Sequence, residues 1–191
     1  IKSKDSLTKP FKEYKKLMPE IYKMLKKGMQ TNLRETEKNI QQVEAQLQAL
    51  IQADEKVKQQ YRLATSVRGI GPVTACALIL CSGAFSKIQK GKQLACYAGV
   101  VPFEHRSGSS VRGCPRVSPW ANKQLKKYLP MAALSAIQVE GELKAYYERQ
   151  LAKGKHKMSV LNAVRNKLVL RVCACIRENQ LYDSNYSYQA A

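Results

Sequence analysis

Ser107 stands between an arginine and a glycine in a stretch that carries positive charge and no negative charge. From His105 to Val139 the sequence contains no aspartate or glutamate. A serine hydroxyl acts as a nucleophile when a base, a cation or a metal assists it, and arginines stabilise the charge that develops in phosphoryl transfer. The pattern points to phosphate chemistry at Ser107 or at the nearby Ser109 or Ser110, among which spacing alone does not choose. Candidate phosphate-binding residues are Arg106, Arg112, Arg116, Lys123, Lys126 and Lys127.

The whole chain is strongly basic, with a formal net charge of +19 over 191 residues. Such an excess indicates a polyanionic partner, and DNA or RNA is the leading candidate. A membrane surface is the weaker alternative, because no apolar run of about 18 residues is present and no amphipathic face carries Trp or Phe. The chain opens at Ile1 without a methionine, which indicates a fragment or a processed product.

Six cysteines occur, and none forms a C-x-x-C pair. The spacing therefore supports neither a zinc site nor a disulfide framework. Cysteines within apolar helical patterns behave as small core residues, so we expect reduced thiols in a cytoplasmic protein. The six are Cys76, Cys81, Cys96, Cys114, Cys173 and Cys175.

The periodicity predicts an all-α chain, in which a long coiled-coil helix precedes a compact helical domain containing a helix-hairpin-helix and an irregular basic loop. Residues 1–64 are expected to form a helical linker that mediates dimerisation, with a new helix at Pro19 and a stop near Gly28. Residues 65–183 form the compact domain, and residues 184–191 are expected to be disordered.

Residues 31–64 contain no glycine or proline and show an apolar seam with a 3.5-residue period. Such a seam predicts a coiled coil, paired either with a second copy or with residues 7–25 folded back. Asp54 is unfavourable in a dry seam and marks a point where the coil splays. An amphipathic core helix is the alternative. The seam reads Leu33, Thr36, Ile40, Val43, Leu47, Leu50, Asp54, Val57, Tyr61 and Ala64.

A Gly-Ile-Gly turn follows Arg68 and precedes a helix of small and aliphatic residues. Gly69 and Gly71 can adopt positive φ and let the backbone approach a phosphate. Pro72 suits the first helical turn, whose free N–H groups attract an anion. Tight packing between two helices is the alternative, and together with Arg68 the turn is a candidate phosphate contact.

Residues 102–119 are rich in Pro, Ser and Gly, and are expected to be a loop or a loose hairpin. Helices are expected at 119–139, 141–153 and 158–181. The polar face of the first of these carries Asn122 beside its lysines.

Three blocks resemble the C-terminal domain of the one-ten insertion-sequence transposases, the Piv-like DNA recombinases. They are V-R-G-I-G-P-V-T-A at 67–75, K-Q-L-A-C-Y-A-G-V-V-P-F-E-H-R-S-G at 92–108, and R-V-S-P-W-A-N-K-Q-L-K-K-Y-L at 116–129. Their order and spacing make the resemblance specific over roughly 65–183.

The resemblance implies a DNA transposase or site-specific recombinase of the bacterial nucleoid. The family's serine-glycine pair maps to Ser107 and Gly108, and implies that Ser107 attacks a phosphodiester and holds the DNA as a phosphoserine. The family's acidic, Mg²⁺-binding residues belong to an N-terminal domain, so no metal site is expected here and the chain alone is expected to be inactive. Family members use a structured guide RNA, and the residues do not decide whether this protein does.

The third block departs from the family pattern, in which a glycine precedes the asparagine and an arginine follows it. Here Ala121 takes the first place and Lys126 or Lys127 the second. Lysine keeps the charge but lacks the bidentate fork of arginine. A non-catalytic nucleic-acid-binding module is the alternative to a recombinase, and a covalent DNA adduct distinguishes the two.

Overall fold

A computed structural model describes residue 15 and residues 17–107 and 111–183. The chain divides into two compact units, Ile1–Asp54 and Glu55–Ala191. The division falls earlier than the expected boundary after residue 64. The expected disorder of 184–191 falls outside the described residues, and so do residues 7–14 and 16 of the segment 7–25 that was expected to fold back.

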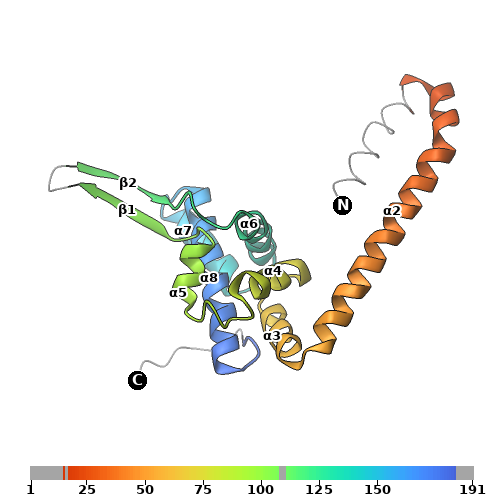
Figure 1. Cartoon of the computed structure of the whole chain (residues 1–191). Coiled ribbons are helices and arrows are strands. Elements are labelled where there is room, and N and C mark those ends of the chain that lie inside the picture. The colour runs from red at the N-terminus through yellow and green to blue at the C-terminus, as the bar shows by residue number, and fades with distance from the viewer. Residues whose placement is uncertain (1–14, 16, 108–110, 184–191) are drawn as a thin grey trace. The chain divides into compact units, whose positions relative to one another are not determined.

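The first unit contains one long helix, α2 (Pro19–Ala53), with proline in its first turn as expected (Figure 1). Gly28 lies inside this helix, so the predicted stop there is wrong. An interior glycine costs a helix only about 1 kcal/mol relative to alanine. The favourable residues on either side outweigh that cost, and the helix continues through Gly28.

The helix breaks at Asp54, the seam position at which the coil was expected to splay, so the expected coiled coil does not run continuously through residue 64. Asp54 has extended backbone angles (φ −112°, ψ 110°), and a second helix, α3 (Glu55–Ser66), follows it. Val57, Tyr61 and Ala64 pack into the apolar core of the second unit. For α3 the alternative of an amphipathic core helix is therefore correct.

The second unit is built around its last helix, α8, which contacts α3, α5, α6 and α7 (Figure 1). Val164, Leu168 and Val172 recur on α8 at four-residue steps and are fully buried, which is the pattern of a helix covered by neighbours. The helices after α3 are α4 (Pro72–Ser82), α5 (Gly91–Tyr97), α6 (Lys123–Gln138), α7 (Glu142–Ala152) and α8 (Lys157–Glu178).

The all-α class is confirmed, with one local exception. Of the irregular loop and the loose hairpin expected at 102–119, the structure has the hairpin. It is a two-stranded antiparallel ribbon, β1 (Pro102–Ser107) and β2 (Val111–Val117), which extends from the helical body of the second unit (Figure 1). Its register shifts between Phe103 and His105, opposite Pro115. Proline has no N–H to donate, so strands accommodate it at their ends and at bulges. Pro102 at the strand end and Pro115 at the register shift therefore occupy positions that a ribbon tolerates.

Among the described residues, no helix is both long and apolar enough to cross a membrane.

Candidate nucleic-acid interface

The ribbon brings the serine and two of the arginines of the predicted site into adjacent rungs of one ladder. Arg106 pairs with Arg112, and Ser107 pairs with Val111. Directly opposed Cα atoms in an antiparallel ladder lie about 4.5–5.5 Å apart. Strand pairing therefore brings the backbone at Arg112 near that at Ser107, five positions apart in the chain. Successive side chains of a strand point to opposite faces, so the two rungs belong to opposite faces of the ribbon. Gly108 lies outside the described residues.

The base of the ribbon is tied to the helical body on both sides. Before β1, the carbonyl of Val100 accepts a hydrogen bond from the side-chain amide of Asn162 on α8, at 2.8 Å. After β2, the backbone N–H of Asn122 donates to the carbonyl of Tyr97 on α5, at 2.8 Å. These bonds position the two strand ends relative to α5, α6 and α8.

Asn122 is the N-cap of α6 and uses both ends of its side-chain amide. The Oδ1 atom accepts hydrogen bonds from the backbone N–H groups of Gln124 and Leu125, each at 3.0 Å. The Nδ2 atom donates to the hydroxyl of Tyr97 at 3.0 Å. Asn122 was predicted to contact nucleic acid, and the bonds that its side chain makes within the chain hold the start of α6. Its cap also explains why the helix begins at Lys123 and not at the expected residue 119.

The three predicted lysines lie exposed in the first turns of α6. No described carboxylate forms an ion pair with them. The ammonium of Lys127 lies 5.3 Å from the ring centre of Tyr128. The N-terminus of a helix carries partial positive charge, which adds to that of Lys123 and Lys126. Arg116 is exposed on β2, so cations from two elements flank the segment that joins the ribbon to α6.

In the Gly-Ile-Gly turn, only the first glycine has the expected positive φ. Gly69 has φ +93°, and a Cβ atom there would lie 2.6 Å from both the Cβ of Ala136 and the carbonyl oxygen of Ala132 on α6. It therefore packs closely against α6. Gly71 has φ −83° and is the N-cap of α4, so the prediction of positive φ there is wrong. Pro72 begins α4 as predicted.

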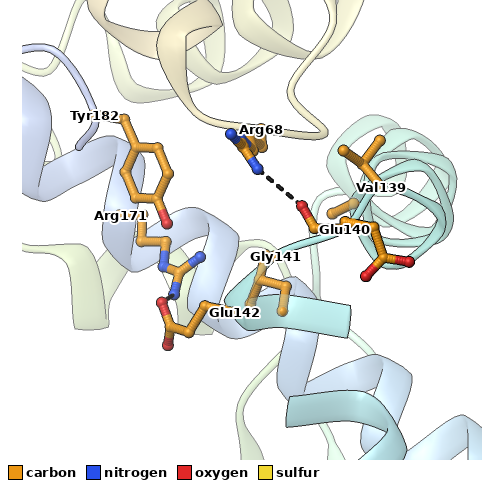
Figure 2. Close-up of a pocket in the computed structure, with 9 residues that line it drawn as sticks. Arg68, Val139, Glu140, Gly141, Glu142, Arg171 and Tyr182 are labelled. Carbon is orange, nitrogen blue, oxygen red and sulfur yellow. Dashed lines mark hydrogen bonds and ion pairs between the residues drawn. The ribbon is translucent and has the colours of Figure 1, made fainter. Parts of the chain in front are cut away.

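Arg68 also makes an internal bond. Its Nη1 atom donates to the carbonyl of Glu140 at 2.9 Å (Figure 2). Arg68 also lines a small cavity of about 20 Å³. A cavity of this volume holds no more than about one water molecule. Arg171 pairs with Glu142 and stacks its guanidinium 5.2 Å from the ring centre of Tyr182. This cluster fastens the end of α6 and the segment after α8 to the core, and it is too small to hold a nucleotide.

The pKa shifts of four described cysteines indicate structural thiols and not reactive ones. Burial raises the pKa of Cys76, Cys81 and Cys175, and it raises the pKa of Cys173 to about 11. A thiol is nucleophilic as its thiolate, so these cysteines are protonated and inert near neutral pH. Within the described ranges, no three or more His, Cys, Asp and Glu side chains gather as metal ligands.

Three residues that were not predicted as site residues contribute to this surface. Tyr97 and Asn162 hold the base of the ribbon. Trp120 was expected inside a helix but lies before α6, with 92% of its surface exposed. Its position between Pro119 and the cap Asn122 is the sequence signal that places it outside the helix.

A comparison with known protein families matches the part of the chain that carries the ribbon and the basic start of α6. Residues 61–148, from α3 into α7, match the model of the Transposase IS116/IS110/IS902 family. The ribbon and helices α4 to α6 thus lie wholly within a range that matches a transposase family. The matched range contains the Gly-Ile-Gly turn, the serine ribbon and the basic start of α6.

Relatives extend the match beyond that range. A 43.6 kDa protein of insertion element IS110 from Streptomyces coelicolor is 31% identical over 145 residues, which cover 74% of this chain and 34% of the relative. The pilin gene-inverting protein of Moraxella bovis is 29% identical over 153 residues, covering 80% of this chain and 48% of the relative. The chain belongs to the IS116/IS110/IS902 transposase family, and spans between a third and a half of these relatives' lengths.

Proposed function

We propose that this chain is the C-terminal portion of a DNA transposase or site-specific recombinase, and that it binds DNA through the ribbon and the start of α6. The main support is the family match over residues 61–148, the range that contains the acid-free basic segment. One relative is named for inverting a pilin gene, which is a rearrangement of DNA. The net charge of +19 agrees with a polyanionic partner.

The exposed cations at the ribbon and at α6 are the proposed phosphate contacts. Arg116 and Lys123 flank the ribbon–α6 junction, and Lys126 and Lys127 continue along the first turns of the helix. Arg106 and Arg112 occupy one rung of the ladder beside Ser107. Phosphate contacts of this kind supply affinity without sequence selection. The same surface suits a structured guide RNA, which the family resemblance implies as a second partner.

The turn between α3 and α4 receives a smaller role in this proposal. Gly69 packs on α6 and Arg68 bonds to Glu140, so both are assigned to positioning. Gly71 has open space around its Cα atom at the start of α4 and remains the proposed backbone contact of a helix-hairpin-helix. Asn122 is assigned to holding α6 in place beneath its lysines.

Ser107 is the proposed nucleophile for strand transfer. Its Oγ atom attacks a phosphodiester phosphorus, an Oγ–P bond forms, and the bond from phosphorus to one deoxyribose oxygen breaks. The hydroxyl proton passes to a base, and the departing deoxyribose oxygen takes up a proton. Cations of the acid-free basic segment would stabilise the additional charge on the phosphate. This assignment to Ser107 and not to Ser109 or Ser110 rests on the family resemblance.

The described residues contain no cluster that fits a metal ion. We therefore assign the Mg²⁺ that the resemblance implies to a nuclease-like N-terminal domain of a longer protein. In that arrangement the chain alone binds DNA without cutting it. The bacterial cytoplasm, on the nucleoid, is the proposed location.

A covalent adduct tests the nucleophile. The longer protein would be incubated with a nicked suicide substrate whose reaction cannot reverse, and the adduct located by peptide mass spectrometry. Adducts are expected in the native protein and in Ser109→Ala and Ser110→Ala, and none in Ser107→Ala. An adduct that persists in Ser107→Ala rejects the assignment. The absence of any adduct favours the alternative, a non-catalytic nucleic-acid-binding module.

Pairing of α2 with a second copy is the proposed route to a dimer or a larger oligomer. Val43, Leu47 and Leu50 occupy consecutive seam positions of α2 and are exposed in the single chain, and heptad seams of this kind bury themselves against a partner helix. Light scattering after size exclusion would measure the mass. Leu47→Lys is expected to yield monomers, whereas Gln42→Lys, off the seam, is expected to leave the mass unchanged. A monomeric native chain contradicts the proposal.

A further inference from the structure

The only tryptophan of the chain is one of its most exposed large side chains. Trp120 is 92% exposed and lies three residues before the start of α6. Tryptophan is highly buried on average, because its indole has a large apolar surface. Its exposure here therefore calls for a partner that covers it.

The backbone around Trp120 is held in place on both sides. The N–H of Trp120 donates to the Oγ of Ser118 at 3.2 Å. The next residue, Ala121, is buried against Gly99, and the residue after it is the cap that bonds to Tyr97. The indole is thus presented by an ordered segment, so little further ordering is needed for binding.

The surroundings of Trp120 favour a nucleic acid over an apolar protein surface. Arg116 and Lys123 are exposed on either side of it in the chain, and no acidic residue occurs between His105 and Val139. Phe103 pairs with Arg116 across the ribbon and is 47% exposed. Aromatic rings set among cations are the common arrangement in sites for single strands, where bases stack on the rings and phosphates bind the cations.

We propose that Trp120 stacks on an unpaired or flipped-out nucleobase of the bound DNA. The inference rests on the proposed DNA binding and adds to it a contact with a base. An aromatic ring stacks on all four bases, so Trp120 would favour unpaired over paired DNA without selecting a sequence. Strand exchange exposes such bases, and the indole is positioned where the basic segment would hold the adjoining phosphates.

The fluorescence of the chain provides a direct test, because every tryptophan photon comes from Trp120. The 191-residue chain would be titrated with an unlabelled single-stranded oligonucleotide and with a duplex of equal length. Stacking on a base is expected to quench the emission, more strongly with the single strand. In parallel, anisotropy of a labelled oligonucleotide would measure the affinity of the native chain, Trp120→Ala and Trp120→Phe.

Trp120→Ala is expected to weaken single-strand binding roughly 5- to 150-fold, the range that corresponds to about 1–3 kcal/mol per stacked base. Trp120→Phe should restore part of the affinity, and thermal unfolding should be unchanged in both variants. Binding with unchanged emission, or an alanine variant as tight as the native chain, overturns the inference while leaving the proposed function intact. Absence of any binding by anisotropy overturns both. A blue shift that grows with protein concentration alone indicates a protein contact and also overturns the inference.

Discussion

Gly99 and Ala121 approach so closely that a Cβ atom on Gly99 would lie 2.3 Å from the Cβ of Ala121. Gly99 also has φ +66°, in the left-handed region. The contact joins the turn after α5 to the segment before α6, and so closes the base of the ribbon. Ala121 therefore leaves no room for a side chain at position 99.

Gly99→Ala is expected to destabilise the second unit by about 2–4 kcal/mol, which combines left-handed strain with overpacking. Adding Ala121→Gly should recover the overpacking part and leave the strain. Urea unfolding of the native chain, the single variant and the double variant measures the three values. A single variant within 0.5 kcal/mol of the native chain contradicts the close contact.

Asn122→Ala is expected to lower the free energy of unfolding by about 1–2 kcal/mol, because two backbone N–H groups of α6 lose their acceptor. Asn122→Asp keeps the acceptor oxygen and loses only the donor to Tyr97, so a smaller loss is expected. Denaturant unfolding compares the variants. Equal losses would show that the bond to Tyr97, and not the cap, carries the stability.

The logarithm of the association constant for DNA should fall linearly with the logarithm of the salt concentration, and each phosphate contact contributes about 0.9 to the slope on duplex DNA. Lys126→Gln is expected to lower the slope by about 0.9, whereas Arg68→Gln, which breaks the bond to Glu140, should affect stability more than the slope. Arg177→Gln is the matched control, fifteen residues along α8 from Asn162, or roughly 22 Å. If Arg177→Gln lowers the slope as much as Lys126→Gln, DNA is not bound at one defined surface of the chain.

The buried thiol of Cys173 predicts a pH dependence of stability. Burial raises its pKa from 9.0 to about 11, against a smaller lowering by Arg177. Between these values the folded chain keeps a proton that the unfolded chain loses, so the free energy of unfolding decreases as pH rises through this window. The stabilising effect of Cys173 over Cys173→Ala should shrink by about 2 kcal/mol from pH 8 to pH 10.5. Urea unfolding at both values tests it, and a constant difference contradicts the shift.

The helices of the second unit could be predicted well from the sequence, because their apolar residues repeat at helical steps and long-range contacts only reinforce that pattern. The break at Asp54 was harder to predict. The aspartate in the seam marked the position, but the seam continues past it without a change of period. Only the structure shows that Val57 and Tyr61 pack into the core of the second unit.

The strand register of the ribbon could not be predicted from the sequence. Proline, serine and glycine usually indicate a loop, and the pairing of Arg106 with Arg112 depends on a register that no local pattern encodes. Likewise, the sequence marked Asn122 as a polar residue beside lysines. In the structure, Asn122 caps α6 and its side chain bonds to Tyr97, which is distant in the chain.

The sequence by itself determined the helical class, the family and the acid-free basic segment with Ser107, because composition, periodicity and motif spacing are local properties of the chain. The tertiary structure decided which of the marked residues face outward. Gly69 and Asn122 are used in packing and capping, whereas Trp120 is left exposed. Exposure depends on which helices meet, and that follows from contacts between residues far apart in the chain.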